Sequence, residues 1–132
     1  GRGFSFVARQ KRITFDGRHF YIDLVFYNYI LKCFVLIDLK VGDLTHQDLG
    51  QMQMYVHYFE DEMMTEGDNP PIGIVLCADK SESVVKYTLP KGEKQIFASK
   101  YMVYLPTEEE LLSEVKKEYD ILKQEKELED GK

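Results

Sequence analysis

The tripeptide Asp38-Leu39-Lys40 follows the apolar run 34–37, which is typical of a buried strand. A further acid, Asp23, ends the preceding apolar run. Ionised side chains are costly to bury unless a counter-charge or a metal replaces the lost water. Because residues two apart in a strand point to the same face, Asp38 and Lys40 project side by side. Two acids and a cation within buried strands therefore indicate a site for a divalent ion and for a water or phosphate oxygen.

The chain has the length and composition of one ordered domain. Its 132 residues can bury a core, and 44% of them are hydrophobic. No apolar run reaches the length of a membrane span, and no signal-peptide pattern is present, so we expect no membrane association. Because the sequence starts at Gly1, we expect residues 1–132 to be a single domain cut from a longer protein.

The two cysteines, Cys33 and Cys77, lie in or beside apolar segments. They are typical of small buried hydrophobic residues in a reducing compartment, so we expect a cytoplasmic protein without a disulfide. The sequence contains no close cluster of Cys and His, which argues against a structural zinc site.

The net charge of −6 is unevenly distributed along the chain. Residues 107–132, which we expect to form an acidic C-terminal helix with a solvent-exposed face, contain ten acids and five bases. The first 18 residues carry five bases, including Arg9 and Arg12, against the single acid Asp16. A basic edge can bind phosphates even in an acidic chain, although these bases could also be ordinary solvated strand charges.

Hydrophobic periodicity predicts a mixed sheet flanked by helices. Three strands joined by short turns form an antiparallel meander: residues 4–10 extending to 15, 20–27 and 32–41. Thr45 and Asp48 resemble a capping box before a helix whose apolar residues recur in steps of three and four. The remaining elements are a buried parallel strand at 72–78, an ambiguous segment at 81–89, a last strand at 101–105 and a helix capped by Thr107. The predicted order is strand-strand-strand-helix-strand-strand-helix.

Five polar side chains are expected to converge at one end of this sheet. Gln51 and Tyr55 are one helical turn apart and therefore point to the same side of the first helix. That helix begins five residues after Lys40, so its first turns lie near the strand that carries Asp38. Asp23 lies on the adjacent antiparallel strand and can come alongside.

These motifs resemble those of the PD-(D/E)XK nuclease superfamily. Asp23, the tripeptide 38–40 and the Gln-x-x-x-Tyr element at 51–55 match its motifs, the last of them as in the RecB-like branches. The segment from residue 3 through Arg9-Gln10 to the helix is similar to YhcG-type bacterial proteins, whose C-terminal half is such a nuclease domain. The resemblance covers roughly residues 3–110. It implies a restriction-endonuclease-like α/β fold and a C-terminal domain of a longer parent protein.

The resemblance also implies roles for the site residues. Asp23, Asp38 and the backbone carbonyl of Leu39 would ligate Mg²⁺ or Mn²⁺, which prefers few carboxylates plus water and phosphate oxygens. Lys40 would orient the attacking water or stabilise charge on the phosphate. Supporting or nucleic-acid-binding roles fall to Gln51, Tyr55, Arg9 and Arg12. Members of the superfamily usually have a further acid on a helix before the first strand, so we expect weaker metal binding in this fragment than in its parent.

We therefore expect a Mg²⁺-dependent endodeoxyribonuclease whose partners are DNA and the N-terminal half of its parent. Duplex cleavage in this superfamily often needs two active sites, which makes a homodimer an option. The alternative is a nucleic-acid-binding or protein-assembly module with the same fold and little or no cleavage. For single residues, Asp38 and Lys40 could form only a buried ion pair, Gln51 could be a surface residue and Tyr55 a core residue.

Overall fold

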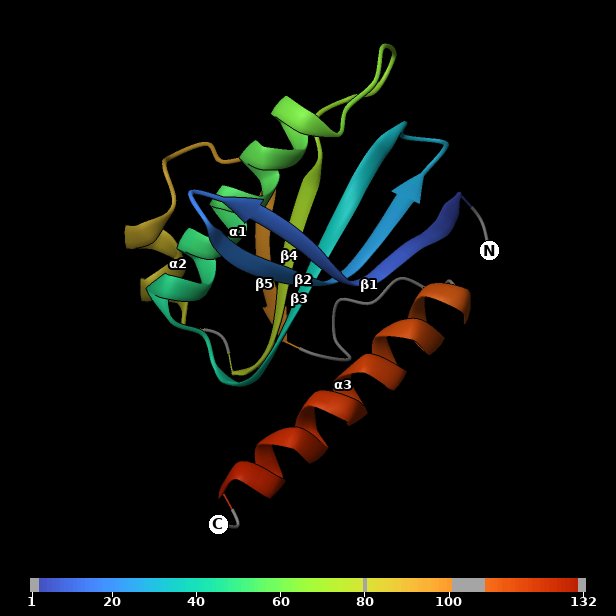
Figure 1. The fold of residues 1–132 in the computed structure, drawn as a ribbon. Coiled ribbons are helices and arrows are strands. Elements are labelled where there is room, and N and C mark those ends of the chain that lie inside the picture. Colours follow the sequence, from blue (N-terminus) through green and yellow to red (C-terminus); the bar gives the residue numbers. More distant parts are fainter. Residues whose placement is uncertain (1–2, 80, 101–108, 131–132) are drawn as a thin grey trace.

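The computed structural model describes residues 3–79, 81–100 and 109–130 of the chain. In these parts it contains a single five-stranded sheet with helices on both faces (Figure 1). The elements in chain order are β1 (Phe4–Phe15), β2 (Arg18–Asn28), β3 (Cys33–Asp43), α1 (His46–Glu62), β4 (Ile72–Asp79), α2 (Glu82–Thr88), β5 (Ile96–Lys100) and α3 (Glu109–Asp130).

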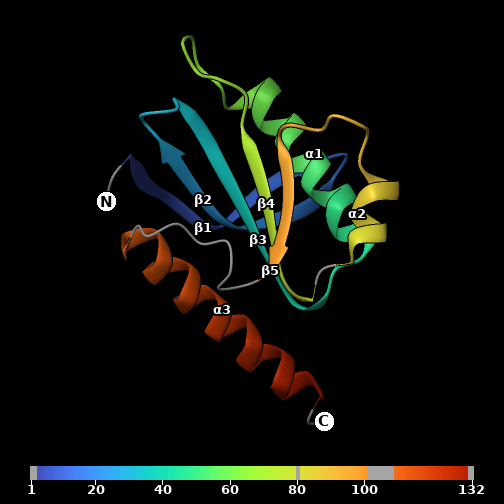
Figure 2. The same ribbon diagram turned by 180° about the vertical axis from the view of Figure 1, so that it is seen from behind.

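The sheet has the order β1-β2-β3-β4-β5, with β3 at its centre. The first three strands are antiparallel, whereas β3, β4 and β5 run parallel (Figure 2). Parallel pairing follows from α1, which crosses from the end of β3 to the start of β4. The predicted meander, the central third strand and the parallel strand after the first helix are therefore confirmed.

Alternating residues of the strands build two cores, one on each face of the sheet. On one face, Val25 and Leu36 pack with the buried stripe of α1. On the other face, Leu24 and Ile37 pack with Val115 of α3. α1 and α2 thus lie on the face opposite α3 (Figures 1 and 2).

Gly73 of β4 allows α1 to approach the sheet closely. A Cβ atom at this position would lie 2.5 Å from Met52 Sδ and 2.9 Å from Val56 Cγ2, both on α1. Real Cβ atoms do not come this close to their neighbours, so a larger side chain would force the Met52 and Val56 side chains, or the helix that carries them, to shift. Since α1 also carries Gln51 and Tyr55, this contact sets the distance between those side chains and the sheet.

The pairing of β2 with β3 stops at Leu24 and Ile37. Continuing the register by one residue would place Asp23 opposite Asp38, and there the strands part. The earlier half of β2 pairs only with β1, while β3 continues against β4. We call this point, defined by Asp23 and Asp38, the fork. The β1–β2 hairpin beyond it curves over α1, where Phe15 contacts Tyr58 at a ring separation of 5.5 Å (Figure 1).

Two further predicted elements follow β4 in the sequence. The ambiguous segment at 81–89 is the short helix α2, capped by Ser81, whose side chain accepts a hydrogen bond from the Val84 amide. A strand, β5, occupies residues 96–100, whereas the predicted strand at 101–105 and the cap Thr107 lie outside the described residues. Within the described part of the chain, no helix is both long enough and apolar enough to cross a membrane.

Candidate active site

Asp23 and Asp38 face each other at the fork and replace the hydrogen bonds that the parted strands no longer make. The Leu39 amide donates to Asp23 Oδ2 at 2.8 Å, and the Asp23 amide donates to Asp38 Oδ1 at 3.2 Å. Each acid therefore binds the backbone of the opposite strand. This reciprocal arrangement fixes both carboxylates relative to the sheet.

The two carboxylates repel each other when both are ionised. Burial raises the pKa of Asp38 to about 8, and the charge of Asp23 adds to this shift. Burial also raises the pKa of Asp23, although hydrogen bonds from the Leu39 amide and the Gln10 side chain oppose the increase. Like charges directly opposite across two strands are unfavourable. A proton or a cation between the two acids would relieve the repulsion.

Lys40 pairs with an acid that the sequence analysis did not assign to the site. Its Nζ lies 3.5 Å from Oδ1 of Asp48, the third helical residue of α1 and a member of its capping box. The alternative of a simple ion pair between Asp38 and Lys40 is therefore not the arrangement observed. The capping box that positions Asp48 was visible in the sequence, as was its short distance from Lys40, and together they could have identified this acid.

Gln51 and Tyr55 line the same pocket of about 160 Å³ as Asp23, Asp38 and Lys40. The predicted convergence of these five side chains is thus what the structure shows. The remaining lining residues are Tyr21, Leu39, Asp48 and Val75.

Tyr55 belongs to both the core and the site. Its side chain is buried in the core, and its hydroxyl donates to the Tyr21 carbonyl at 3.4 Å. Burial, followed by the charges of Asp38 and Asp23, raises the pKa of Tyr55, so this residue stays a neutral phenol. Gln51 is exposed at the pocket, which leaves its amide available to a ligand.

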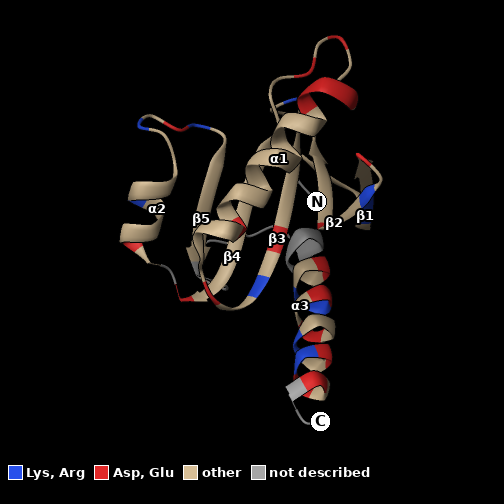
Figure 3. Ribbon diagram, turned by 60° about the vertical axis from the view of Figure 1, so that its left-hand side comes forward, with Lys and Arg blue, Asp and Glu red and all other residues tan. Residues whose placement is uncertain are grey.

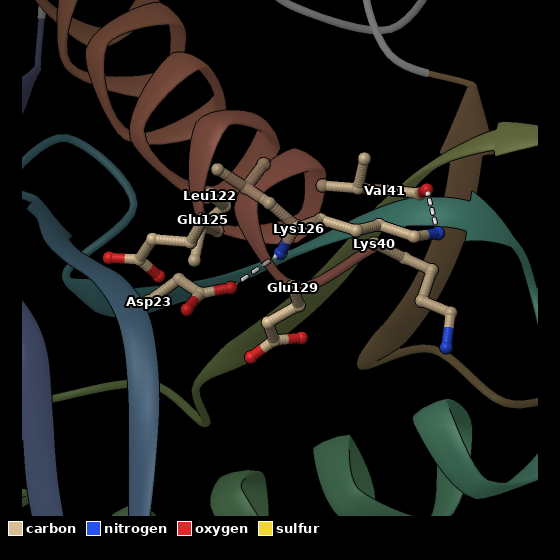
Figure 4. Close-up of a pocket in the computed structure, with 8 residues that line it drawn as sticks. Asp23, Lys40, Val41, Leu122, Glu125, Lys126 and Glu129 are labelled. Carbon is tan, nitrogen blue, oxygen red and sulfur yellow. Dashed lines mark hydrogen bonds between the residues drawn. The ribbon is translucent and has the colours of Figure 1, made fainter. Parts of the chain in front are cut away.

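A second cleft of about 390 Å³ opens on the other side of the fork, between β3 and α3 (Figure 4). It shares Asp23, Leu39 and Lys40 with the first pocket. Figure 4 shows the carboxylates of Glu125 and Glu129 reaching from α3 toward the side of the cleft where Asp23 lies. The fork is therefore accessible from both faces of the sheet, and α3 lines its side of the cleft with Glu125 and Glu129 together with Lys126.

The two arginines predicted to support the site differ in their surroundings. Arg9 Nε lies 2.7 Å from Glu118 Oε1 on α3, so this guanidinium is part of an internal ion pair. Arg12 is exposed on the edge strand β1. The expectation that the acidic face of α3 is simply solvated is wrong for Glu118, which is buried with 2% exposure. Acidic and basic residues are interspersed along the described part of this helix (Figure 3).

Comparisons with known proteins identify the family. A family model described as the YhcG PDDEXK nuclease domain matches residues 1–117. The chain belongs to this family. It is also 38% identical, over 94% of its length, to the Escherichia coli (strain K12) protein named "Putative nuclease YhcG". The aligned region is 33% of that protein, so the chain spans about a third of its relative's length.

Solved structures confirm the restriction-endonuclease-like fold of this YhcG-family domain. A repair endonuclease from Pyrococcus abyssi aligns with a TM-score of 0.52 and 23% identity, covering 74% of this chain and 38% of that one. EndoMS in a complex with double-stranded DNA aligns with a TM-score of 0.55 and 18% identity, covering 74% and 36%. At these identities the likeness establishes the fold alone.

The donor set at the fork suits the divalent metal that PD-(D/E)XK nucleases generally use. Among the described residues, no group of three or more His, Cys, Asp or Glu side chains could hold a metal ion alone. Mg²⁺ needs only one or two carboxylates, because water and phosphate oxygens complete its coordination. Asp23 and Asp38 supply two, and a cation between them would remove the repulsion that contributes to the raised pKa of Asp38.

Proposed function

We propose that this YhcG-family domain is a metal-dependent nuclease that hydrolyses phosphodiester bonds in DNA. The observation that carries the proposal is the pair of opposed carboxylates at the fork, Asp23 and Asp38, with Lys40 two residues along β3. The fold shared with EndoMS, solved in a complex with double-stranded DNA, supports DNA as the substrate.

Asp23, Asp38 and the Leu39 carbonyl would hold Mg²⁺ or Mn²⁺. When bound, the ion would lower the pKa of a coordinated water and neutralise charge on the phosphate. Lys40, held 3.5 Å from Asp48, would place its ammonium against a phosphate oxygen or the attacking water. The neutral Tyr55 hydroxyl and the exposed Gln51 amide would contact the nucleic-acid backbone or support the site.

Outside the pocket, Arg12 on β1 is available to bind a DNA phosphate. Arg9 would also contact a DNA phosphate, because its side chain remains 50% exposed despite its ion pair with Glu118. Because the chain covers a third of its curated relative, the remainder of a longer parent is a proposed partner. We also propose that the protein forms a homodimer and is located in the cytoplasm.

The test compares cleavage of supercoiled, single-stranded and branched DNA in Mg²⁺, in Mn²⁺ and in excess chelator. We expect metal-dependent nicking that Asp38→Asn and Asp38→Ala abolish. The matched control is Asp16→Asn, at an exposed hairpin turn where Asn suits the positive φ of 55°. Cleavage that persists in both Asp38 variants would exclude this site.

The acids on the α3 side of the fork favour a second candidate, a nucleic-acid-binding or assembly module with little cleavage. Glu125 and Glu129 line the cleft that contains Asp23, and their charges would oppose a phosphate approaching from α3, against the attraction of Lys40 and Lys126 in the same cleft. DNA binding without nicking in either metal would support this candidate over the nuclease.

A further inference from the structure

Glu118 is a buried carboxylate far from the sequence motifs of the site. It lies on α3 with 2% exposure, on the helix that packs its apolar residues against the sheet. Arg9 on β1 donates to both of its oxygens, from Nε at 2.7 Å and from Nη2 at 3.2 Å. This bidentate pairing balances the charge of Glu118 and leaves lone pairs for another donor.

That other donor is the side-chain amide of Gln10. Its Nε2 donates to Glu118 Oε2 at 2.7 Å and to Asp23 Oδ1 at 2.9 Å. One amide therefore uses its two hydrogens to bridge a buried acid on α3 and an acid of the fork. Gln10 adopts a φ of 49°, which is unfavourable for a strand residue other than glycine. The backbone strain is localised at the residue that makes this bridge.

We propose that Glu118 is a positioning residue for the metal site and acts on Asp23 through Gln10. The proposal rests on the proposed nuclease function. Because a carboxylate only accepts hydrogen bonds, Glu118 orients the Gln10 side chain so that its NH2 group, and not its carbonyl oxygen, lies between the carboxylates of Glu118 and Asp23. With Leu39 donating to Oδ2 and Gln10 to Oδ1, Asp23 cannot rotate about its Cβ–Cγ bond without losing a hydrogen bond. Each oxygen keeps a free lone pair for the metal.

The test measures Mn²⁺ affinity by electron paramagnetic resonance, together with the thermal midpoint of the metal-free protein. Glu118→Met keeps the side-chain length but removes both acceptors, and we expect the Kd for Mn²⁺ to rise about 10-fold. Glu118→Gln keeps one acceptor and should restore part of the affinity. The matched control, Glu114→Met, lies one turn earlier on α3 at a more exposed position and should leave the Kd unchanged.

Gln10→Asn separates positioning from charge and does not depend on α3. It shortens the bridge by one methylene, changes no charge and suits a positive φ. We expect the same rise in Kd as for Glu118→Met, and no further rise in the double variant, because both residues act through one amide. Additive losses, or a Kd unchanged in both single variants while the thermal midpoint of Glu118→Met falls, would overturn the proposal.

The same assay tests the proposed metal site separately from the positioning role of Glu118. If the unmodified protein binds Mn²⁺ and Asp23→Asn leaves the Kd unchanged, the metal is elsewhere and both proposals fall. If Asp23→Asn weakens binding but the Glu118 and Gln10 variants do not, only the positioning role is refuted.

Discussion

Replacing Asp38 by Asn should stabilise the metal-free protein at neutral pH while abolishing cleavage. The native state holds a proton on Asp38 up to about pH 8, whereas an unfolded aspartate releases it near its ordinary pKa of 3.8. Between these values unfolding releases a proton, so the stability of the native state falls as the pH rises. The protonated Asp38 side chain therefore contributes its full stability below pH 3.8, and this stability is lost above about pH 8. The amide introduced by Asp38→Asn does not ionise, so the variant does not lose stability in this way as the pH rises.

The magnitude follows from the size of this window. The interval from 3.8 to about 8 spans roughly four pH units, and each unit is worth about 1.4 kcal/mol, which gives an upper limit of roughly 5–6 kcal/mol. Water in the pocket reduces the cost of the charge, so we expect Asp38→Asn to gain about 3 kcal/mol at pH 8. The side-chain carbonyl that Asp38→Asn introduces can still accept a hydrogen bond from the Asp23 amide, while the new amino group faces the Asp23 carboxylate.

The assay is urea unfolding in chelator at about pH 4.5, 6 and 8, repeated with Mn²⁺ at the highest pH. The stability advantage of Asp38→Asn should grow with pH in chelator. It should shrink or reverse in Mn²⁺, because a metal at about 100 times its Kd stabilises the unmodified protein by about 2.7 kcal/mol. A variant that is less stable at the highest pH, or an advantage independent of pH, would refute the reasoning that the buried charge of Asp38, together with repulsion from Asp23, destabilises the metal-free state.

Three further predictions concern the elements around the fork. Gly73→Ala should cost about 1–3 kcal/mol in urea unfolding, because its Cβ would meet the Met52 side chain; an unchanged midpoint would show that Met52 and α1 repack around the added methyl group without cost. Thr45→Ala should cost about 1 kcal/mol in urea unfolding by removing the hydroxyl that accepts from the Asp48 amide. Lys40→Met should slow nicking roughly 100-fold or more while the Kd for Mn²⁺ stays the same; a large change in Kd would mean that Lys40 shapes the metal site itself.

Local patterns were sufficient to predict the first half of the fold. The apolar runs ending at Asp23 and at Asp38 each lie in one strand, and the capping box at Thr45 marks where α1 begins. Convergence of the site residues then followed from short connections, since the β2–β3 turn and the β3–α1 loop leave little freedom. These features depend on residues close together in the sequence, which is why they were visible in it.

The contacts of α3 could not be predicted in the same way. Gln10 and Glu118 are 108 residues apart, and nothing near either residue in the sequence indicates that they meet. Glu118 lies in a run of charged residues, so its surroundings predict exposure, yet one buried face of the helix includes it. Arg9 likewise belongs to a basic segment typical of phosphate binding, but its partner is this distant acid. Segment 81–89 was ambiguous because α2 has seven residues and none of its side chains is fully buried.

The fork bears on the order in which the protein folds and binds a metal. Asp23 and Asp38 each accept an amide of the opposite strand, so both carboxylates have a fixed place before any cation arrives. In small zinc domains the ligands gather only when the metal does, and removing the metal unfolds the chain. Here the hydrogen bonds of the sheet hold both carboxylates without a metal, so an ion bound at the proposed site would meet a preformed pair of ligands. Removing a metal from the proposed site should therefore leave the domain folded.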